Sequence, residues 1–201
     1  MTRESPPARK PPTSNQPSAK PSGPKPPKRV TAQYLENAAL YYLQRFASSS
    51  ANLRRVLMRK VDRSAQAHGT DPAEGARWVE DLIARYQRSG LLNDAAYAEM
   101  RAASLHRRGT STRAIREKLA SKGIARDEAD KALDALDEEV DGDLNLTAAL
   151  ALARRRRLGP YRLPEKRAEF RDKDLAALGR AGFAYDIARR VVDAEDPDSV
   201  E

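Results

Sequence analysis

The stretch Ile115–Ile124, with the sequence IREKLASKGI, reads as the end of one helix and the turn into the next. Gly123 fits the left-handed conformation just beyond a helix end, which glycine adopts without steric cost. Leu119 and Ile124 then stand where a Schellman turn brings two apolar side chains together. The stretch therefore predicts a short helix, a defined turn and a second helix.

Related phrases occur twice more, LRRVLMRKV from Leu53 and LAALGRAGF from Leu175. The second of these repeats the turn around Gly182. The segment YQRSGL repeats it around Gly90, with Leu91 as the second apolar residue of the turn. Because the same turn chemistry implies the same angle between helices, the repetition predicts a repeated unit.

The spacing of the phrases gives the size of that unit. Leu57 and Leu119 are 62 residues apart, and Leu119 and Leu178 are 59 apart. Three short helices and their turns fill about 60 residues, so the unit is a three-helix repeat. Thin units must lean on their neighbours, which predicts an elongated, curved array. In the first repeat no turn glycine follows Lys60, so we expect a longer loop at about 62–71.

From Thr31 onward, apolar residues recur at helical spacing with almost no strand pattern. The segment Asp71-Pro72-Ala73-Glu74 is a strong helix start, with an N-cap acid and a proline at the first helical position. We predict an all-α fold of nine short helices in three tandem three-helix repeats. The expected boundaries are 31–91, 92–141 and 142–195, with a disordered C-terminus at 196–201.

Residues 1–30 contain nine of the 13 prolines and almost no sizeable apolar side chain. Such a segment buries too little surface to offset its ordering entropy, so its composition predicts a disordered leader with polyproline character. It carries seven basic residues against one acidic residue, a net +6 of the total +8. The net charge therefore does not by itself predict nucleic-acid binding. The leader is either a solubilising segment or an electrostatic tether to DNA or an acidic partner.

Several classes of protein are excluded by what the sequence lacks. Cysteine is absent, which excludes disulfides and thiolate metal sites and favours a cytoplasmic protein. No apolar run approaches the ~18 residues of a membrane span, and no secretory signal is present. Glycine-rich phosphate loops are absent. His68 and His106 lack metal-ligand spacing and read as surface residues. We expect no enzyme, no metal and no cofactor.

Basic residues recur around the second helix of each predicted repeat, whereas the third helices of repeats two and three are acidic. Tandem stacking would align the second helices along one edge, which predicts a basic strip on a nearly neutral body. Ordinary helix-surface charge is the alternative. Recurrence in all three repeats favours a functional surface.

The segment TRAIREKLASKGIARDEADKAL has the apolar spacing and the turn glycine of a helix-turn-helix DNA reader. Its second helix, RDEADKALDALDEEV, would then enter the major groove. That helix is acidic and the phosphates would repel it, so we do not expect this segment to read an operator.

The chain resembles the RecX family of RecA regulators over about residues 38–192. The resemblance rests on SANLRRVLMRK, on GLLNDAAYAEMRAASLHRRGTSTRAIREKLASKGI, and on RRRRLGPYR followed by LAALGRAGF. It implies a cytoplasmic, non-enzymatic protein that lies in the groove of the RecA–DNA filament. Family members limit strand exchange, ATP hydrolysis and coprotease activity, which affects DNA repair and the SOS response. The leader has no counterpart in the family core.

The expected partners are the RecA filament and single-stranded or double-stranded DNA, bound by a monomer. Thirteen basic residues are the candidates for these contacts: Arg54, Arg55, Lys60, Arg107, Arg108, Arg113, Arg116, Lys122, Arg154, Arg155, Arg156, Arg157 and Arg162. Two rival functions stay open. One is a stand-alone nucleic-acid-binding repeat protein without a recombinase partner, and the other is a helical adaptor.

Overall fold

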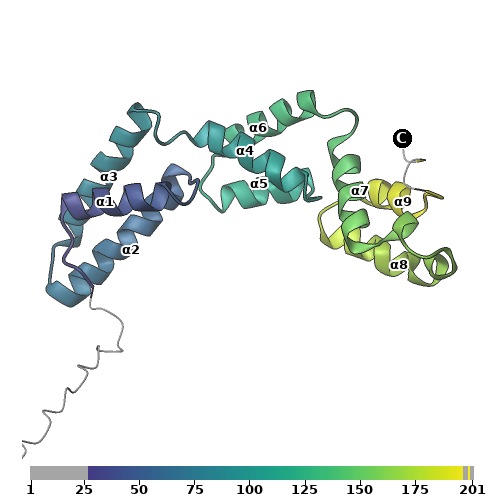
Figure 1. Cartoon of the computed structure of the whole chain (residues 1–201), viewed down its shortest axis with the longest axis horizontal. Helices are drawn as coiled ribbons and strands as arrows, with labels where there is room; N and C mark the ends of the chain where they lie inside the picture. Colours follow the sequence, from purple (N-terminus) through teal and green to yellow (C-terminus); the bar gives the residue numbers. More distant parts are fainter. Residues whose placement is uncertain (1–26, 197–198, 200–201) are drawn as a thin grey trace, which may run out of the picture.

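The structure, a computed structural model, describes residues 27–196 and 199. These residues form nine α-helices and one short 3-10 turn, without a strand (Figure 1). The helices are α1 (Ala32–Leu43), α2 (Ser50–His68), α3 (Pro72–Arg88), α4 (Asp94–His106), α5 (Thr112–Ala120), α6 (Arg126–Glu139), α7 (Leu144–Arg156), α8 (Pro164–Arg180) and α9 (Tyr185–Val192). The all-α class is confirmed.

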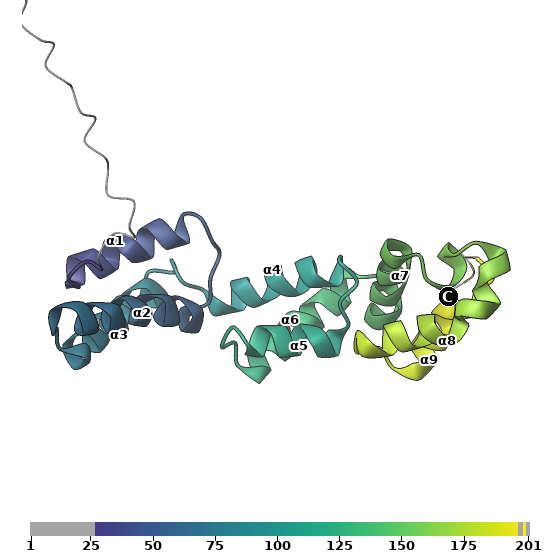
Figure 2. The same ribbon diagram turned by 90° about the horizontal axis from the view of Figure 1, so that it is seen from below.

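The helices form three successive groups of three, and the whole is an elongated, curved array (Figures 1 and 2). We call α1–α3 unit 1, α4–α6 unit 2 and α7–α9 unit 3. Buried side chains form three separate cores, one for each unit, around Leu57, Leu119 and Leu178. The main helix–helix contacts fall within units. The orientation of one unit on the next therefore depends on small junctions.

The turn predicted at the end of α5 is present. Gly123 has φ +80°, and the N–H of Ile124 donates to the carbonyl of Leu119 at 3.2 Å. The corresponding bond after α8 joins Phe183 and Leu178 at 3.3 Å. In both places the two apolar residues of the turn are buried. This sequence motif therefore ends a helix in both places, as the sequence predicts.

Two local predictions are wrong. After α3 the turn is closed by Leu92, which is buried and donates to the carbonyl of Tyr86, whereas Leu91 is exposed. In unit 1 the expected long loop is helix instead. The second helix α2 runs on to His68 and ends at Gly69, which has φ +63°.

The last residues of the predicted leader pack against unit 1. Val30 is only 3% exposed, lies in the first core, and donates its N–H to Ser64 Oγ at 2.8 Å. The carbonyl of Pro27 lies 2.7 Å from His68 Nε2. Residues 27–30 therefore belong to the folded body, which corrects the leader boundary at 30. The rest of the leader and the end of the predicted C-terminal tail lie outside the described residues.

Two truncations should separate these parts. Removing residues 1–26 deletes none of these packing contacts, so the melting temperature should stay within a few degrees. Removing residues 1–30 also deletes Val30, whose burial is worth about 1.5–3 kcal/mol. Thermal unfolding followed by circular dichroism should show the larger loss for the longer truncation. Equal melting temperatures for the two truncations would contradict the role given to Val30.

Candidate functional site

The second helices of the three units lie end to end. Ser49 caps the N-terminus of α2, and its Oγ donates to the carbonyl of Lys122 at the end of α5, at 2.5 Å. Ser111 caps α5 in the same way and donates to the carbonyl of Ala181, just past α8, at 2.9 Å. The helices α2, α5 and α8 therefore form one row, on the lower side in Figure 1.

A second contact is repeated at both junctions. The N–H of Ser50 donates to Asp94 Oδ1 at 2.7 Å, and the N–H of Thr112 donates to Asn145 Oδ1 at 3.0 Å. In each case the first residue of a second helix is bonded to the start of the next unit's first helix. Unit 1 therefore meets unit 2 in the way that unit 2 meets unit 3.

The turn glycines have a further role at these junctions. A Cβ on Gly123 would lie 2.3 Å from Ala51 Cβ, and one on Gly182 would lie 2.7 Å from Ser111 Oγ. Glycine is therefore needed at these positions for two reasons, the left-handed turn and the close approach of the preceding unit. The sequence carried a signal for this junction, because SSSANLR and TSTRAIR recur at the same offset as Leu57 and Leu119.

Replacing Ser111 by alanine should destabilise the protein more than loss of an ordinary cap. The hydroxyl accepts from the N–H of Ala114 and also satisfies the carbonyl of Ala181. We expect a loss of ~2–3 kcal/mol, which is about 1 for the cap and the rest for the orphaned carbonyl. Thr31→Ala is the control, because Thr31 caps α1 and takes no part in the junctions between units. If chemical denaturation gives the same loss in free energy of unfolding for both variants, Ser111 does not stabilise the junction.

The candidate residues on α2 are engaged within the chain. Arg54 forms an ion pair with Glu80. Arg55 crosses the junction and donates to the carbonyl of Ser121 at 2.9 Å. Lys60 lies over the ring of Tyr34, 5.6 Å from its centroid. Arg55 thus helps to join units 1 and 2, and a partner that used it would compete with this bond.

The candidates around α5 are more available. The Arg113 side chain is 76% exposed and makes only a long contact, 3.4 Å, with Glu117. Arg116 pairs with Asp130 at 2.6 Å but keeps 44% of its side chain exposed. Lys122 is half-buried, and its carbonyl receives the junction bond of Ser49. These residues place positive charge on the middle of the row.

Six arginines stand at the ends of α4 and α7, where unit 2 joins unit 3. Arg155 Nη1 donates to the carbonyl of Arg108 at 2.7 Å, which brings the end of α7 against the end of α4. We call this the arginine cluster, and its members are exposed: Arg107, Arg108, Arg154, Arg155, Arg156 and Arg157. Cations at helix C-termini are favoured by the helix dipole, which offsets part of the repulsion between these like charges.

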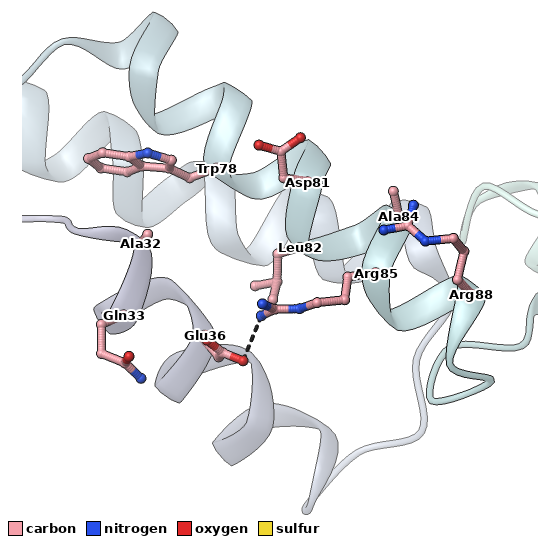
Figure 3. A pocket seen from close by; sticks show the side chains of 9 residues that line it. All are labelled: Ala32, Gln33, Glu36, Trp78, Asp81, Leu82, Ala84, Arg85 and Arg88. Carbon is pink, nitrogen blue, oxygen red and sulfur yellow. Dashed lines mark hydrogen bonds and ion pairs between the residues drawn. The ribbon is translucent and has the colours of Figure 1, made fainter.

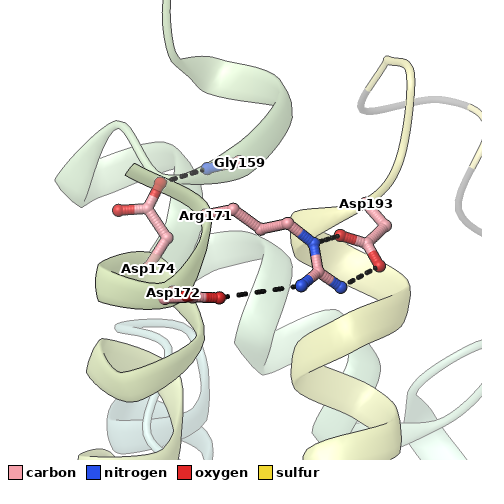
Figure 4. Close-up of polar contacts among 5 residues, drawn as sticks. All are labelled: Gly159, Arg171, Asp172, Asp174 and Asp193. Atoms are coloured by element: carbon pink, nitrogen blue, oxygen red, sulfur yellow. Dashed lines mark hydrogen bonds and ion pairs between the residues drawn. The ribbon is translucent and has the colours of Figure 1, made fainter. Parts of the chain in front are cut away.

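Arg162 is a structural residue and not part of an open surface. Its side chain is 21% exposed and forms a two-pronged ion pair with Asp174, at 3.0 and 2.7 Å. Asp174 also accepts from the N–H of Gly159 (Figure 4) and is itself 2% exposed. Hydrogen bonding to Asp174 raises the pKa of Arg162. Breaking this pair would leave a buried charge, which costs about 3–5 kcal/mol.

The signal for Asp174 was in the repeat. It stands four residues before Leu178, the spacing that places Leu53 and Ile115 in the cores of units 1 and 2. A carboxylate at that position needs a buried cation. Nearby, Arg171 makes a two-pronged ion pair with Asp193 and lowers the pKa of that carboxyl (Figure 4).

His106 is not the surface residue that its sequence position indicates. It is 4% exposed, and its Nε2 lies 2.9 Å from the carbonyl of Leu144, so it joins α4 to the start of α7. His68 is exposed at the end of α2. Within residues 27–196, no group of three or more His, Cys, Asp or Glu side chains could hold a metal ion.

The acidic third helix of unit 2 faces away from the row. Asp134, Asp137 and Glu138 of α6 are exposed, and in Figure 1 α6 lies on the upper side, opposite α5. The two edges of unit 2 therefore differ in sign of charge. None of the described helices has the length and apolar character needed to cross a bilayer.

The fold and the surface define the class of this protein. It is an elongated helical-repeat protein with a basic row and an arginine cluster. Residues 93–133 match the model of the second three-helix domain of RecX. Over 174 residues the chain is 51% identical to the regulatory protein RecX of Myxococcus xanthus, covering 86% of this chain and 91% of that one. The chain belongs to the RecX family of regulatory proteins.

Two further comparisons agree. The regulatory protein RecX of Agrobacterium fabrum is 33% identical over 159 residues, covering 79% of this chain and 82% of that one. A crystal structure of a regulatory protein RecX superposes with a TM-score of 0.57 at 23% identity, covering 81% of this chain and 72% of that one. The solved structure supports the fold.

Proposed function

We propose that this chain regulates a RecA recombinase filament, mainly as an inhibitor of its strand exchange, ATP hydrolysis and coprotease activity. Membership of the RecX family supports a regulatory role. The observation that carries the finer proposal is the row of α2, α5 and α8, joined twice by the same serine junction. A row of this kind is suited to lie along a repeating partner, since successive units can meet successive protomers.

The charges support a partner that is negative where the row meets it. Arg113 on α5 has a side chain that is 76% exposed, the arginine cluster is exposed as well, and the acidic α6 lies on the other edge. Arginine is suited to phosphates and carboxylates because its planar fork binds both in two-pronged fashion. We therefore place the contact with the filament or its DNA on the row and the cluster. In this proposal the protein acts in the cytoplasm and as a monomer.

Co-sedimentation tests the proposal against its rivals. The protein is mixed with RecA filaments on single-stranded DNA, with the same DNA alone, and with neither, and ATP hydrolysis is measured in parallel. The proposal predicts stronger sedimentation with filaments and reduced hydrolysis. Equal sedimentation with bare DNA and unchanged hydrolysis would indicate a stand-alone nucleic-acid-binding protein. No sedimentation in any mixture would favour an adaptor.

A further inference from the structure

A shallow groove lies between α1 and α3 in unit 1 (Figure 3), whereas the arginine cluster lies where unit 2 joins unit 3. Trp78 and Asp81 stand about one turn apart on α3, and Ala32, Gln33 and Glu36 line the groove from α1. Glu36 is paired with Arg85 at 2.6 Å. Asp81 is exposed, and no ion pair is formed by it within residues 27–196. The groove therefore offers a half-buried indole and, at its rim, the unpaired carboxylate of Asp81. The other exposed charge of its lining that forms no ion pair among the described residues, Arg88, lies two turns farther along α3.

An indole beside a carboxylate is suited to a proline-rich, basic segment. Proline rings pack on aromatic faces, and a polyproline II helix loses little entropy on binding because its backbone is already extended. A lysine or arginine next to the prolines can pair with a carboxylate at the rim. Trp78 packs against the core of unit 1 but stays partly exposed along the groove, and Asp81 forms no ion pair among the described residues.

A segment of that kind begins beside the groove. Residues 1–26 contain eight prolines and five basic residues against one acidic residue. They join the folded body at Pro27, whose carbonyl lies against His68 at the end of α2. In Figure 3 the chain enters α1 at Ala32, on the side of the groove where Trp78 lies. The leader is therefore attached five residues before Ala32, which lines the groove.

The reach is sufficient. Ala32 lines the same groove as Trp78, and it follows Pro27 by five residues, which span at most about 18 Å. The segment 20–26, KPSGPKP, spans about 22 Å as a polyproline II helix. Because the segment is tethered, its effective concentration at the groove is on the order of millimolar, so a weak intrinsic affinity suffices.

We propose that this groove binds the leader segment 20–26 of the same chain. Its prolines pack on Trp78, and Lys20 or Lys25 pairs with Asp81. Docking gives the leader a defined place on unit 1 and occupies the α1–α3 face. The leader is then a ligand of its own body, and any partner of that face must displace it.

The chain contains one tryptophan, so its fluorescence reports on the groove alone. Acrylamide quenching is compared between the full chain and a chain that begins at Pro27, which retains all three cores. Removal of the leader should raise the quenching constant roughly twofold, since a tethered ligand keeps the site mostly occupied. A synthetic peptide of residues 1–26, added to the shortened chain, should restore the protection.

Asp81→Lys in the full chain keeps the reporter and should raise the quenching constant toward that of the shortened chain. Asp134→Lys is the matched control, because it makes the same charge change on exposed α6 and should leave quenching unchanged. Equal quenching of the full and shortened chains in low salt would overturn the proposal. Protection that grows with protein concentration would also overturn it, since the groove would then be filled by a second copy.

Discussion

Changing Arg107, Arg154 and Arg156 to glutamate should weaken suppression of RecA-dependent ATP hydrolysis by more than tenfold in concentration. All three side chains are exposed members of the arginine cluster, and the change alters charge by six units. Contacts to phosphate or carboxylate groups at this place would become repulsive. Arg155 is left intact because its bond to the carbonyl of Arg108 joins units 2 and 3. Stability should shift by at most a few tenths of a kcal/mol for each substitution.

The matched control changes Arg77, Lys131 and Arg190 to glutamate. These residues are also exposed, and the change alters charge by the same six units outside the cluster. Inhibition titrations of both variants at two salt concentrations separate a local contact from the effect of net charge. If the control loses inhibition as severely as the cluster variant, the cluster is not the contact. If neither variant loses inhibition, the partner meets another surface.

Gly109→Ala should lower the free energy of unfolding more than alanine at any other glycine in the described turns. Gly109 has φ +74°, and a Cβ there would lie 2.5 Å from the backbone nitrogen of Leu152 and 2.8 Å from the carbonyl oxygen of Ala148. Helix backbone cannot move aside as a flexible side chain can. We expect a loss of ~3–5 kcal/mol, of which 1–2 is left-handed strain and the rest is overpacking.

Gly90→Ala is the control for that prediction. Gly90 has φ +75°, but no atom lies within 4 Å of its Cβ position, so only the strain of about 1–2 kcal/mol applies. Denaturant unfolding gives the two losses, and small-angle scattering shows whether α7 has been pushed away from the turn after α4. Equal losses, with unchanged scattering, would show that the junction accommodates the methyl group.

The sequence predicts the helices well because each carries its own start and stop. The phrase around Gly123 contains the glycine, the two apolar residues and the preceding helix, and all of these act within ten residues. It does not reveal what approaches the turn from outside. Ala51 lies against Gly123 from 72 positions away, and only the comparison of SSSANLR with TSTRAIR points to that contact.

The site was harder to predict for the same reason. Arg162 and Arg157 stand in one basic stretch, but Asp174 takes Arg162 into the core whereas Arg157 stays exposed. Composition assigned Val30 to the leader. In the structure its side chain is buried in the core of unit 1, and residues 27–30 belong to the folded body. The pattern of basic residues therefore predicted which region of the surface is positive. It did not predict which of these residues are exposed, because that depends on contacts with residues far away in the sequence.

The serine junction is directional, because a serine at the start of one second helix bonds to a carbonyl just past the end of the next unit's second helix. The same contact cannot form at the two outer ends of the row. The second helix of unit 3, α8, begins after Leu163, which makes no side-chain cap bond and offers no hydroxyl to a following unit. At the opposite end, the residue equivalent to Lys122 is Lys60, which lies inside α2 and not just past its end, so its carbonyl is not available for a serine of another unit. Both ends of the row are thus closed to a further copy joining through the same contact. Over the described residues, the length of the row along a partner is therefore set by three covalently linked units and not by protein concentration.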